Sequence, residues 1–235
     1  MEGASVAVVC NALNIPFFIL RAISDSADMD ASFNFDEFLE SLSKIKNIPL
    51  PAEVSHFKMV PPFRRELMRL QKNVIKDAKK AGVLALFYPN KNHNTNLVLI
   101  LRKTYKGVHS AQVAFPGGKL ESQDKSLKDA AVRETFEEIG VPKKDIDVIK
   151  TLTQVYIPPS NFYVQPFIGI AQYTPKFIKQ EDEVDKIIEV DLLDLLNDNQ
   201  IITKTVSTSY SVDVEVPAFK LNNYTVWGAT AMMLS

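Results

Sequence analysis

Hydrophobic and polar positions divide the chain into two unequal parts. In the first part, residues 1–46, their spacing predicts a helix, a short buried strand and a second helix. The helices cover residues 2–13, which are rich in Ala and Val, and residues 35–46, which are amphipathic. Pro49 and Pro51 follow, and because neither can continue a helix, they predict a break at this point.

Beyond the break, the pattern predicts one helix and then a series of strands. Residues 63–80 are basic and amphipathic, which favours a helix that ends before Gly82. Short apolar runs separated by turn-forming residues predict strands at 83–88, 97–101, 112–115, 149–157, 163–173 and 187–190. A helix lies between the third and fourth runs, and a last helical run, 229–235, stops without a cap, as in a truncated chain. Strands that bracket a central helix predict an α/β fold, a mixed sheet with helices on its faces.

The central helix carries an unusual distribution of charge. At about 100° per residue, Glu134, Glu137 and Glu138 occupy one narrow sector of its surface. Such an acidic stretch is usually a solvated helix face. Three crowded carboxylates repel one another, however, unless a cation lies among them. A hard divalent cation, Mg²⁺ or Mn²⁺, held through oxygen ligands, is the simplest explanation for the cluster.

The residues around the acidic face support this interpretation. Arg133 lies one turn before Glu137 and is expected to orient its carboxylate through a charge-assisted hydrogen bond. Gly140 is expected to end the helix, and Gly117 and Gly118 allow the backbone to approach a ligand closely. The opposite side of the helix is apolar and is predicted to pack against the sheet through Val132, Phe136 and Ile139.

The stretch from Gly117 to Val141 resembles a Nudix box, whose general form is G-x5-E-x7-R-E-U-x-E-E-x-G-U, with U an aliphatic residue. Asp124 stands where Glu is usual, and one additional residue separates it from Arg133. Both departures resemble the coenzyme A pyrophosphatase branch of the family. Upstream, that branch's pattern is matched by Arg102, His109 and 113–118, but not by Lys106, Gly107, Ala111 or Gln112. The segment 227–231 also resembles this branch, so that the resemblance covers about residues 47–235.

The resemblance implies a Nudix-type α/β/α sandwich that hydrolyses the pyrophosphate bond of coenzyme A, giving phosphopantetheine and adenosine 3′,5′-bisphosphate. It implies Glu134 and Glu138 as the chief ligands of Mg²⁺ or Mn²⁺, with Glu134 and Glu137 as catalytic residues. Glu137 is a further metal ligand or the general base, and Glu183 in a later acidic loop competes for the role of base. The residues expected to contact the substrate are Arg102, His109 and Gly118.

The N-terminal residues resemble a different family, the C-terminal part of a methylthioadenosine/S-adenosylhomocysteine nucleosidase. The similar segments are M-E-G-A at residues 1–4 and R-A-I-S-D at 21–25, which would place the family's ribose and purine contacts on Met1, Glu2 and Asp25. About forty residues are too few to form that pocket. We therefore expect residues 1–42 to be a fragment without nucleosidase activity and 43–235 to be the hydrolase, with the junction between 33 and 43.

Composition narrows the classes of partner. The net charge of -1 gives no general attraction to nucleic acids or anionic membranes, so the expected partner is a small nucleotide. Cys10 is the single cysteine, and no basic region precedes the apolar residues near the start, which favours a cytoplasmic protein. A homodimer remains open. So do two other functions: a hydrolase of ADP-ribose or a dinucleotide, and a non-catalytic ligand-binding module. A bifunctional fusion with nucleosidase activity is disfavoured because most of the nucleosidase is absent.

Overall fold

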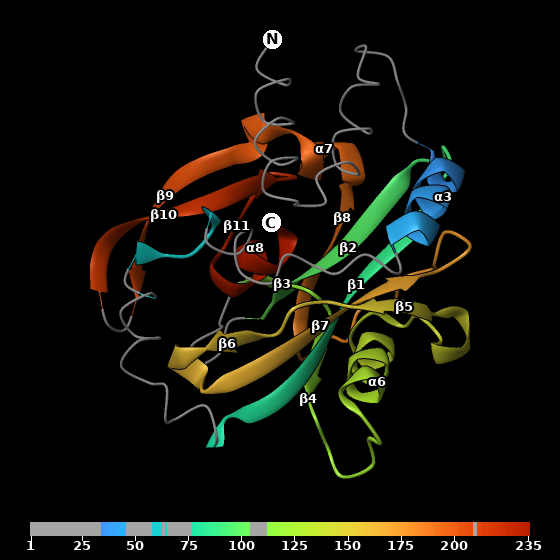
Figure 1. Cartoon of the computed structure of the whole chain (residues 1–235), viewed down its shortest axis with the longest axis horizontal. Helices are drawn as coiled ribbons and strands as arrows, with labels where there is room; N and C mark the ends of the chain where they lie inside the picture. Colours follow the sequence, from blue (N-terminus) through green and yellow to red (C-terminus); the bar gives the residue numbers. More distant parts are fainter. Residues whose placement is uncertain (1–33, 46–57, 63, 65–76, 104–111, 209–210) are drawn as a thin grey trace.

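The computed structural model describes residues 34–45, 58–62, 64, 77–103, 112–208 and 211–235 (Figure 1). The first predicted helix and strand lie outside these residues, as do His109, Met1, Glu2 and Asp25. Most of the helix predicted at 63–80 also lies outside them, but its last two residues, Lys79 and Lys80, begin a strand, so the prediction is wrong there.

Eight strands form one mixed sheet through the middle of the molecule (Figure 1). Their order is β3-β2-β1-β7-β5, while β4 pairs with β1, β6 with β7 and β8 with β2. The strands are β1 Lys79–Pro89, β2 Thr95–Arg102, β3 Val113–Ala114, β4 Gly117–Lys119, β5 Asp147–Thr151, β6 Val155–Ile157, β7 Phe162–Ile170 and β8 Val184–Asp191. Only the β1–β7 pairing among these is parallel. The predicted mixed sheet is confirmed.

Strands β1 and β2 pair with each other only next to the turn that joins them, at Phe87–Pro89 and Thr95–Leu97. Further along, β3 pairs with β2 at Ile100 and Leu101, and β4 pairs with β1 at residues 81–83. The segment 113–119 therefore occupies the space between the two strands. This insertion places the backbone of Gly117 and Gly118 inside the sheet.

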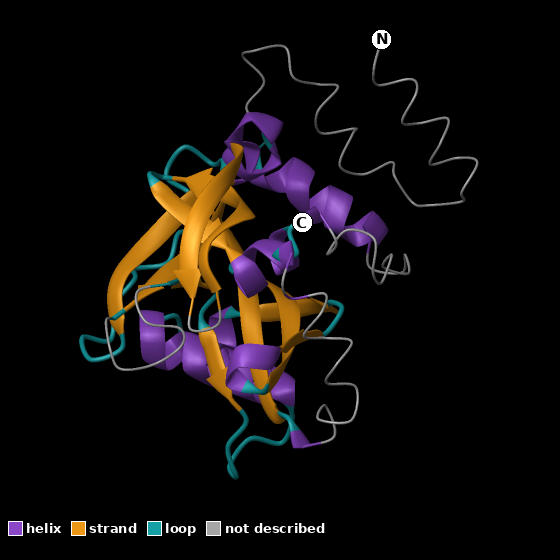
Figure 2. Ribbon diagram, turned by 90° about the vertical axis from the view of Figure 1, so that its left-hand side faces the viewer, coloured by secondary structure: helices purple, strands orange, loops and turns teal. Residues whose placement is uncertain are grey.

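Alternating residues of β1 supply the core on the two faces of the sheet. Leu84, Leu86 and Tyr88 belong to the cluster on one face, which α6 (Leu127–Ile139) covers with Ala131. Ala85 belongs to the cluster on the other face. That face is covered by a sheet of three strands, β9 Ile201–Thr208, β10 Ser211–Leu221 and β11 Tyr224–Trp227, together with α8 Gly228–Leu234. Figure 2 shows helices on both sides of the strands.

The second sheet was not anticipated, whereas α8 agrees with the predicted run 229–235. At the start of β10, residues 211–216 alternate strictly between polar residues and valine, which is the strand pattern that could have indicated it. The Thr230 hydroxyl of α8 donates to the Val113 carbonyl at 2.9 Å and so ties α8 to β3. None of the helices in the described residues is both long and apolar enough to cross a membrane.

The predicted strand 149–157 is two strands, β5 and β6, which both pair with β7. Thr151 pairs with Phe167 and Val155 with Val164, so the three residues 152–154 face only Gln165 and Pro166. Pro166 has no N–H to donate, and the additional residue interrupts the ladder. Short helices among the described residues include α7 Leu192–Leu196 and the 3-10 turns Lys143–Asp145, Pro158–Ser160 and Asp198–Gln200.

Helix α3 (Phe35–Ile45) agrees with the predicted helix 35–46 and packs against the main sheet. Its apolar side chains, Phe35, Phe38 and Leu42, form a cluster with Ile170 of β7 and Leu192 of α7. The Phe38 and Phe87 rings lie 4.9 Å apart, and the Phe35 N–H donates to the His93 carbonyl. The helix crosses the division expected at residues 42 and 43, and that division stays a prediction.

Candidate metal site

The acidic helix α6 is fixed at both ends by its own sequence. The Ser126 hydroxyl caps the first turn by accepting from the Asp129 N–H, at 3.2 Å. Gly140 ends the helix with φ 76°, and its N–H donates to the Phe136 carbonyl, which confirms the predicted cap. Position 82 must be glycine because a β-carbon there would lie 2.0 Å from the Leu127 carbonyl oxygen. The N-terminal turn of α6 is therefore pressed against the backbone of β1.

This close packing selects the face of α6 that is buried. Ala131 and Thr135, which are small, lie on it and are fully buried. Phe136 lies about 140° around the helix from Ala131 and is 45% exposed, so its predicted burial against the sheet is wrong. Ile139 is buried as predicted, and Val132 is partly buried.

Glu138 is a buried carboxylate, only 2% exposed. One of its oxygens accepts from the Gly117 N–H at 2.8 Å, and the other accepts from Nη1 of Arg102 at 3.3 Å. Burial raises its pKa to about 8, although these two partners oppose the shift. The repulsion of Glu134 and Glu183 adds to the rise. A buried acid with two carboxylate neighbours gains strongly from a bound cation.

Glu134 lies one turn before Glu138, against the inserted strand β4. A β-carbon at Gly118 would fall 2.4–2.7 Å from the Glu134 carboxyl group, so glycine is required to leave room for it. Burial raises the pKa of Glu134, and the adjacent Arg133 opposes the rise. Gly118 was predicted to contact the substrate, and that stays a prediction. In the structure Gly118 lies against the carboxyl group of Glu134, a candidate metal ligand.

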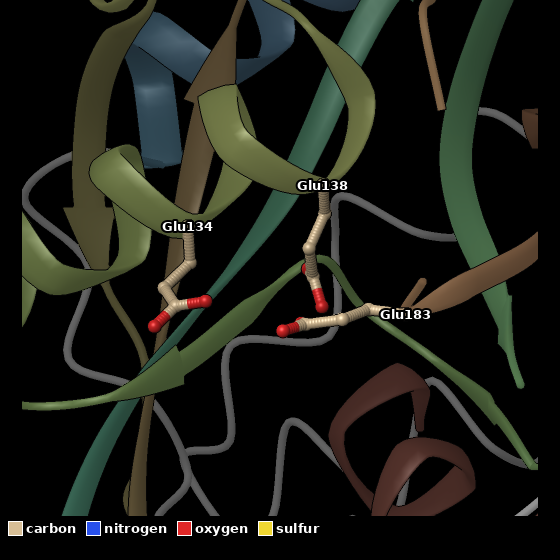
Figure 3. A group of neighbouring side chains, drawn as sticks. All are labelled: Glu134, Glu138 and Glu183. Atoms are coloured by element: carbon tan, nitrogen blue, oxygen red, sulfur yellow. The ribbon is translucent and has the colours of Figure 1, made fainter. Parts of the chain in front are cut away.

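Glu183 reaches the same place from the loop before β8. One carboxylate oxygen from each of Glu134, Glu138 and Glu183 lies within 4.8 Å of the other two, and Figure 3 shows the three side chains pointing toward one another. Three converging oxygen donors suit a hard divalent cation. The residues present therefore fit a bound metal ion.

Arg133 joins four groups around this cluster. Its guanidinium donates twice to Asp124, both at 3.0 Å, and also to Glu134 at 3.0 Å, to Glu137 at 2.7 Å and to the Lys119 carbonyl. These bonds confirm the predicted coupling of Arg133 with Glu137, and the guanidinium lowers the pKa of Asp124. Asp124, where the general Nudix form has Glu, thus holds the arginine.

The structure brings together only part of the predicted site. Glu134 and Glu138 converge, and Arg102 contacts the second of them. Glu137 is half exposed and bonded to Arg133, outside the group of three. Glu183, which the sequence named only as a competing base, completes that group.

Comparison with known proteins agrees with this picture. The family model of the NUDIX domain matches residues 78–207, and that of the phosphorylase superfamily matches residues 1–47. The peroxisomal coenzyme A diphosphatase ndx-8 of Caenorhabditis elegans is 27% identical over 155 residues, which are 65% of this chain and 64% of that protein. The uncharacterized Nudix hydrolase NudL of Enterobacter sp. (strain 638) is 28% identical over 185 residues, 76% of this chain and 87% of the relative. The chain thus spans slightly less than two thirds of ndx-8.

Solved structures of Nudix proteins are also similar, at low identity. A Nudix hydrolase from M. Smegmatis, RenU, is 20% identical with a TM-score of 0.41, covering 48% of this chain and 71% of its own. A MutT/nudix family protein from Enterococcus faecalis is 19% identical with a TM-score of 0.42, covering 78% and 68%. The phosphorylase match agrees with the nucleosidase resemblance of the N-terminal residues. Because the NUDIX model matches more than half of the sequence and contains the three converging glutamates, the chain belongs to the Nudix family.

Proposed function

We propose that this protein is a metal-dependent hydrolase that cleaves the pyrophosphate bond of coenzyme A or its derivatives, giving phosphopantetheine and adenosine 3′,5′-bisphosphate. The observation that carries the proposal is the convergence of Glu134, Glu138 and Glu183. The choice of coenzyme A is supported by the G-G-x5-D form that ends at Asp124, and by the name of the nematode relative.

The proposed ligands are carboxylates, which suit Mg²⁺ or Mn²⁺. When bound, the metal would neutralise the diphosphate, polarise a phosphoryl oxygen and lower the pKa of a water molecule. Glu134 and Glu138 would hold it from α6, and Glu183, from the loop before β8, would serve as a further ligand or as the base that accepts the proton of the water. Glu137 remains the alternative base, and its carboxylate accepts from the same Arg133 nitrogen that binds Glu134.

Other residues would position these groups and the substrate. The Gly117 N–H fixes one oxygen of Glu138, which leaves the other to Arg102 and a ligand. Arg102 donates one N–H to Glu138, and because a guanidinium has five donors, it can also hold a substrate phosphate. Arg133 would orient Glu134 through the 3.0 Å bond. We retain His109 as a predicted phosphate contact.

A substrate panel tests this function. The purified protein would be incubated with Mg²⁺ or Mn²⁺ and coenzyme A, acetyl-coenzyme A, ADP-ribose or a dinucleoside polyphosphate, and the products separated by chromatography. We expect adenosine 3′,5′-bisphosphate from coenzyme A, and none with Glu138→Gln. A higher kcat/KM for ADP-ribose or the dinucleotide would favour the alternative substrate class. No hydrolysis of any compound, with retained binding, would favour a ligand-binding module.

A further inference from the structure

The loop before β8 places the carboxylate of Glu183 beside two other carboxylates, which is electrostatically unfavourable. Glu183 follows two other acids, Glu181 and Asp182, and all three are exposed. Yet only Glu183 brings a carboxylate oxygen within 4.8 Å of those of Glu134 and Glu138, where like charges repel. An exposed side chain is free to turn toward solvent, away from like charges. Its placement therefore depends on how the backbone of the turn is held.

Gln180 holds this turn through its side chain. The side-chain oxygen of Gln180 accepts from the Asp182 N–H at 2.7 Å and from the Glu183 N–H at 2.6 Å. The Gln180 carbonyl accepts from the Val184 N–H at 3.0 Å. A side-chain acceptor that satisfies the next backbone donors fixes a turn in one conformation.

The same residue connects the turn to the acidic helix. The Gln180 N–H donates to the carbonyl of Glu138 at 2.9 Å, and two residues earlier the Ile178 N–H donates to the Ile139 carbonyl at 3.0 Å. On the other side of the turn, the Glu183 carbonyl accepts from the Lys103 N–H at 2.9 Å, next to β2. Gln180 thus binds the backbone of Glu138 with its own N–H and the backbone of Glu183 with its side chain.

We propose that Gln180 is a positioning residue that fixes Glu183 at the distance from Glu138 that a divalent cation requires. The inference rests on the metal site of the proposed function, but it concerns metal binding, which is measurable without substrate. Residues that orient metal ligands typically change metal affinity by about 10–100-fold when they are replaced.

The test compares two substitutions in the full chain. Gln180→Leu removes the acceptor at similar size, whereas Gln180→Glu keeps an oxygen acceptor of the same reach. Mn²⁺ binding would be titrated by electron paramagnetic resonance of the free ion. We expect about a 10-fold weaker Kd for the leucine variant and retention of most of the affinity by the glutamate variant. Lys176→Ala, at an exposed position of the same loop four residues before Gln180, is the matched control and should bind as wild type.

A mutant cycle with Glu183→Gln separates positioning from a general loss of structure. If Gln180 acts through Glu183, adding Gln180→Leu to Glu183→Gln should not weaken Mn²⁺ binding further. Melting temperatures in EDTA should differ from wild type by no more than about 3 °C. An unchanged Kd for Gln180→Leu, or an equal loss in both backgrounds, would overturn the proposal.

The outcomes also separate this inference from the proposed function. Mn²⁺ binding that depends on Gln180, without hydrolysis of any diphosphate in the substrate panel, would overturn the function and support the positioning role. If the Gln180→Leu variant hydrolyses the substrate and binds Mn²⁺ as the wild type does, the function is supported and the positioning role is overturned.

Discussion

Gly118 lies so close to Glu134 that a β-carbon on the glycine would fall 2.4 Å from the Glu134 carboxyl carbon. The conflicting atoms are the far end of a flexible side chain and not backbone. A substitution at Gly118 would therefore be accommodated by rotation of Glu134, which would move a proposed ligand out of the cluster.

Gly118→Ala should consequently lose metal affinity while the protein stays folded. We expect the Kd for Mn²⁺ to rise by at least about 10-fold, with little change in the melting temperature measured in EDTA. Gly228→Ala should behave in the opposite way. Gly228 has φ 67°, and a β-carbon added there would meet no atom within 4 Å, so alanine costs about 1 kcal/mol in backbone strain and leaves Mn²⁺ binding unchanged. Equal metal loss in both variants would contradict this prediction.

Glu138→Gln should change the pH dependence of stability in metal-free protein. Folding raises the pKa of Glu138 from 4.5 to about 8, so between these values the folded state keeps a proton that the unfolded state has released. The free energy of unfolding therefore falls as the pH rises through this window. The glutamine variant lacks this contribution and should gain stability relative to wild type from pH 5 to 8, in urea unfolding with EDTA. Parallel wild-type and variant curves would contradict the prediction.

Arg133→Lys should damage both stability and turnover. Arg133 is 8% exposed, and an ammonium group cannot reproduce its two parallel bonds to Asp124 while also reaching Glu134 and Glu137. We expect a loss of about 3 kcal/mol in urea unfolding and of at least about 10-fold in kcat/KM. Lys128→Arg, at an exposed position of α6, is the control and should lie within about 0.5 kcal/mol of wild type. A fully active Arg133→Lys variant would show that the arginine does not orient the acids.

Phe38→Ala should destabilise the hydrolase although the residue lies in the N-terminal part of the sequence. The Phe38 ring is buried against Phe87 of β1, and removal of a buried phenylalanine costs about 3–5 kcal/mol. Ser41→Ala, at a solvent-accessible position of α3, should cost much less. Thermal unfolding measures both, and an unchanged melting temperature for Phe38→Ala would mean that α3 contributes nothing to the fold.

Local patterns in the sequence were sufficient to predict many of the helices and strands. The spacing of apolar residues predicted α3, β1, β2 and α8, and glycine chemistry predicted the end of α6 at Gly140. The burial of Phe136 was predicted wrongly. The close approach of α6 to β1 at Gly82 requires small residues on the buried face of the helix, and the apolar pattern alone does not reveal this requirement. The division of β5 from β6 depends on the partner strand at Pro166, which neither segment reveals alone.

The candidate site was predictable where its residues share one helix. Glu134 and Glu138 are four positions apart, so helical geometry alone places them together. Glu183 lies far along the chain, and its place depends on the β2–β8 pairing and on the turn at Gln180. Among three successive acids, the sequence has no local feature that selects Glu183 as the one that faces α6.

The packing of α3 has a consequence for how this gene product could have been assembled. The match to the phosphorylase superfamily runs to residue 47, yet the helix at 35–45 closes a hydrophobic cluster of the Nudix fold. The end of the phosphorylase similarity therefore does not coincide with the edge of the hydrophobic core that the described residues form. A recombination event that cut at the end of the first similarity would have separated the enzyme from part of its own core.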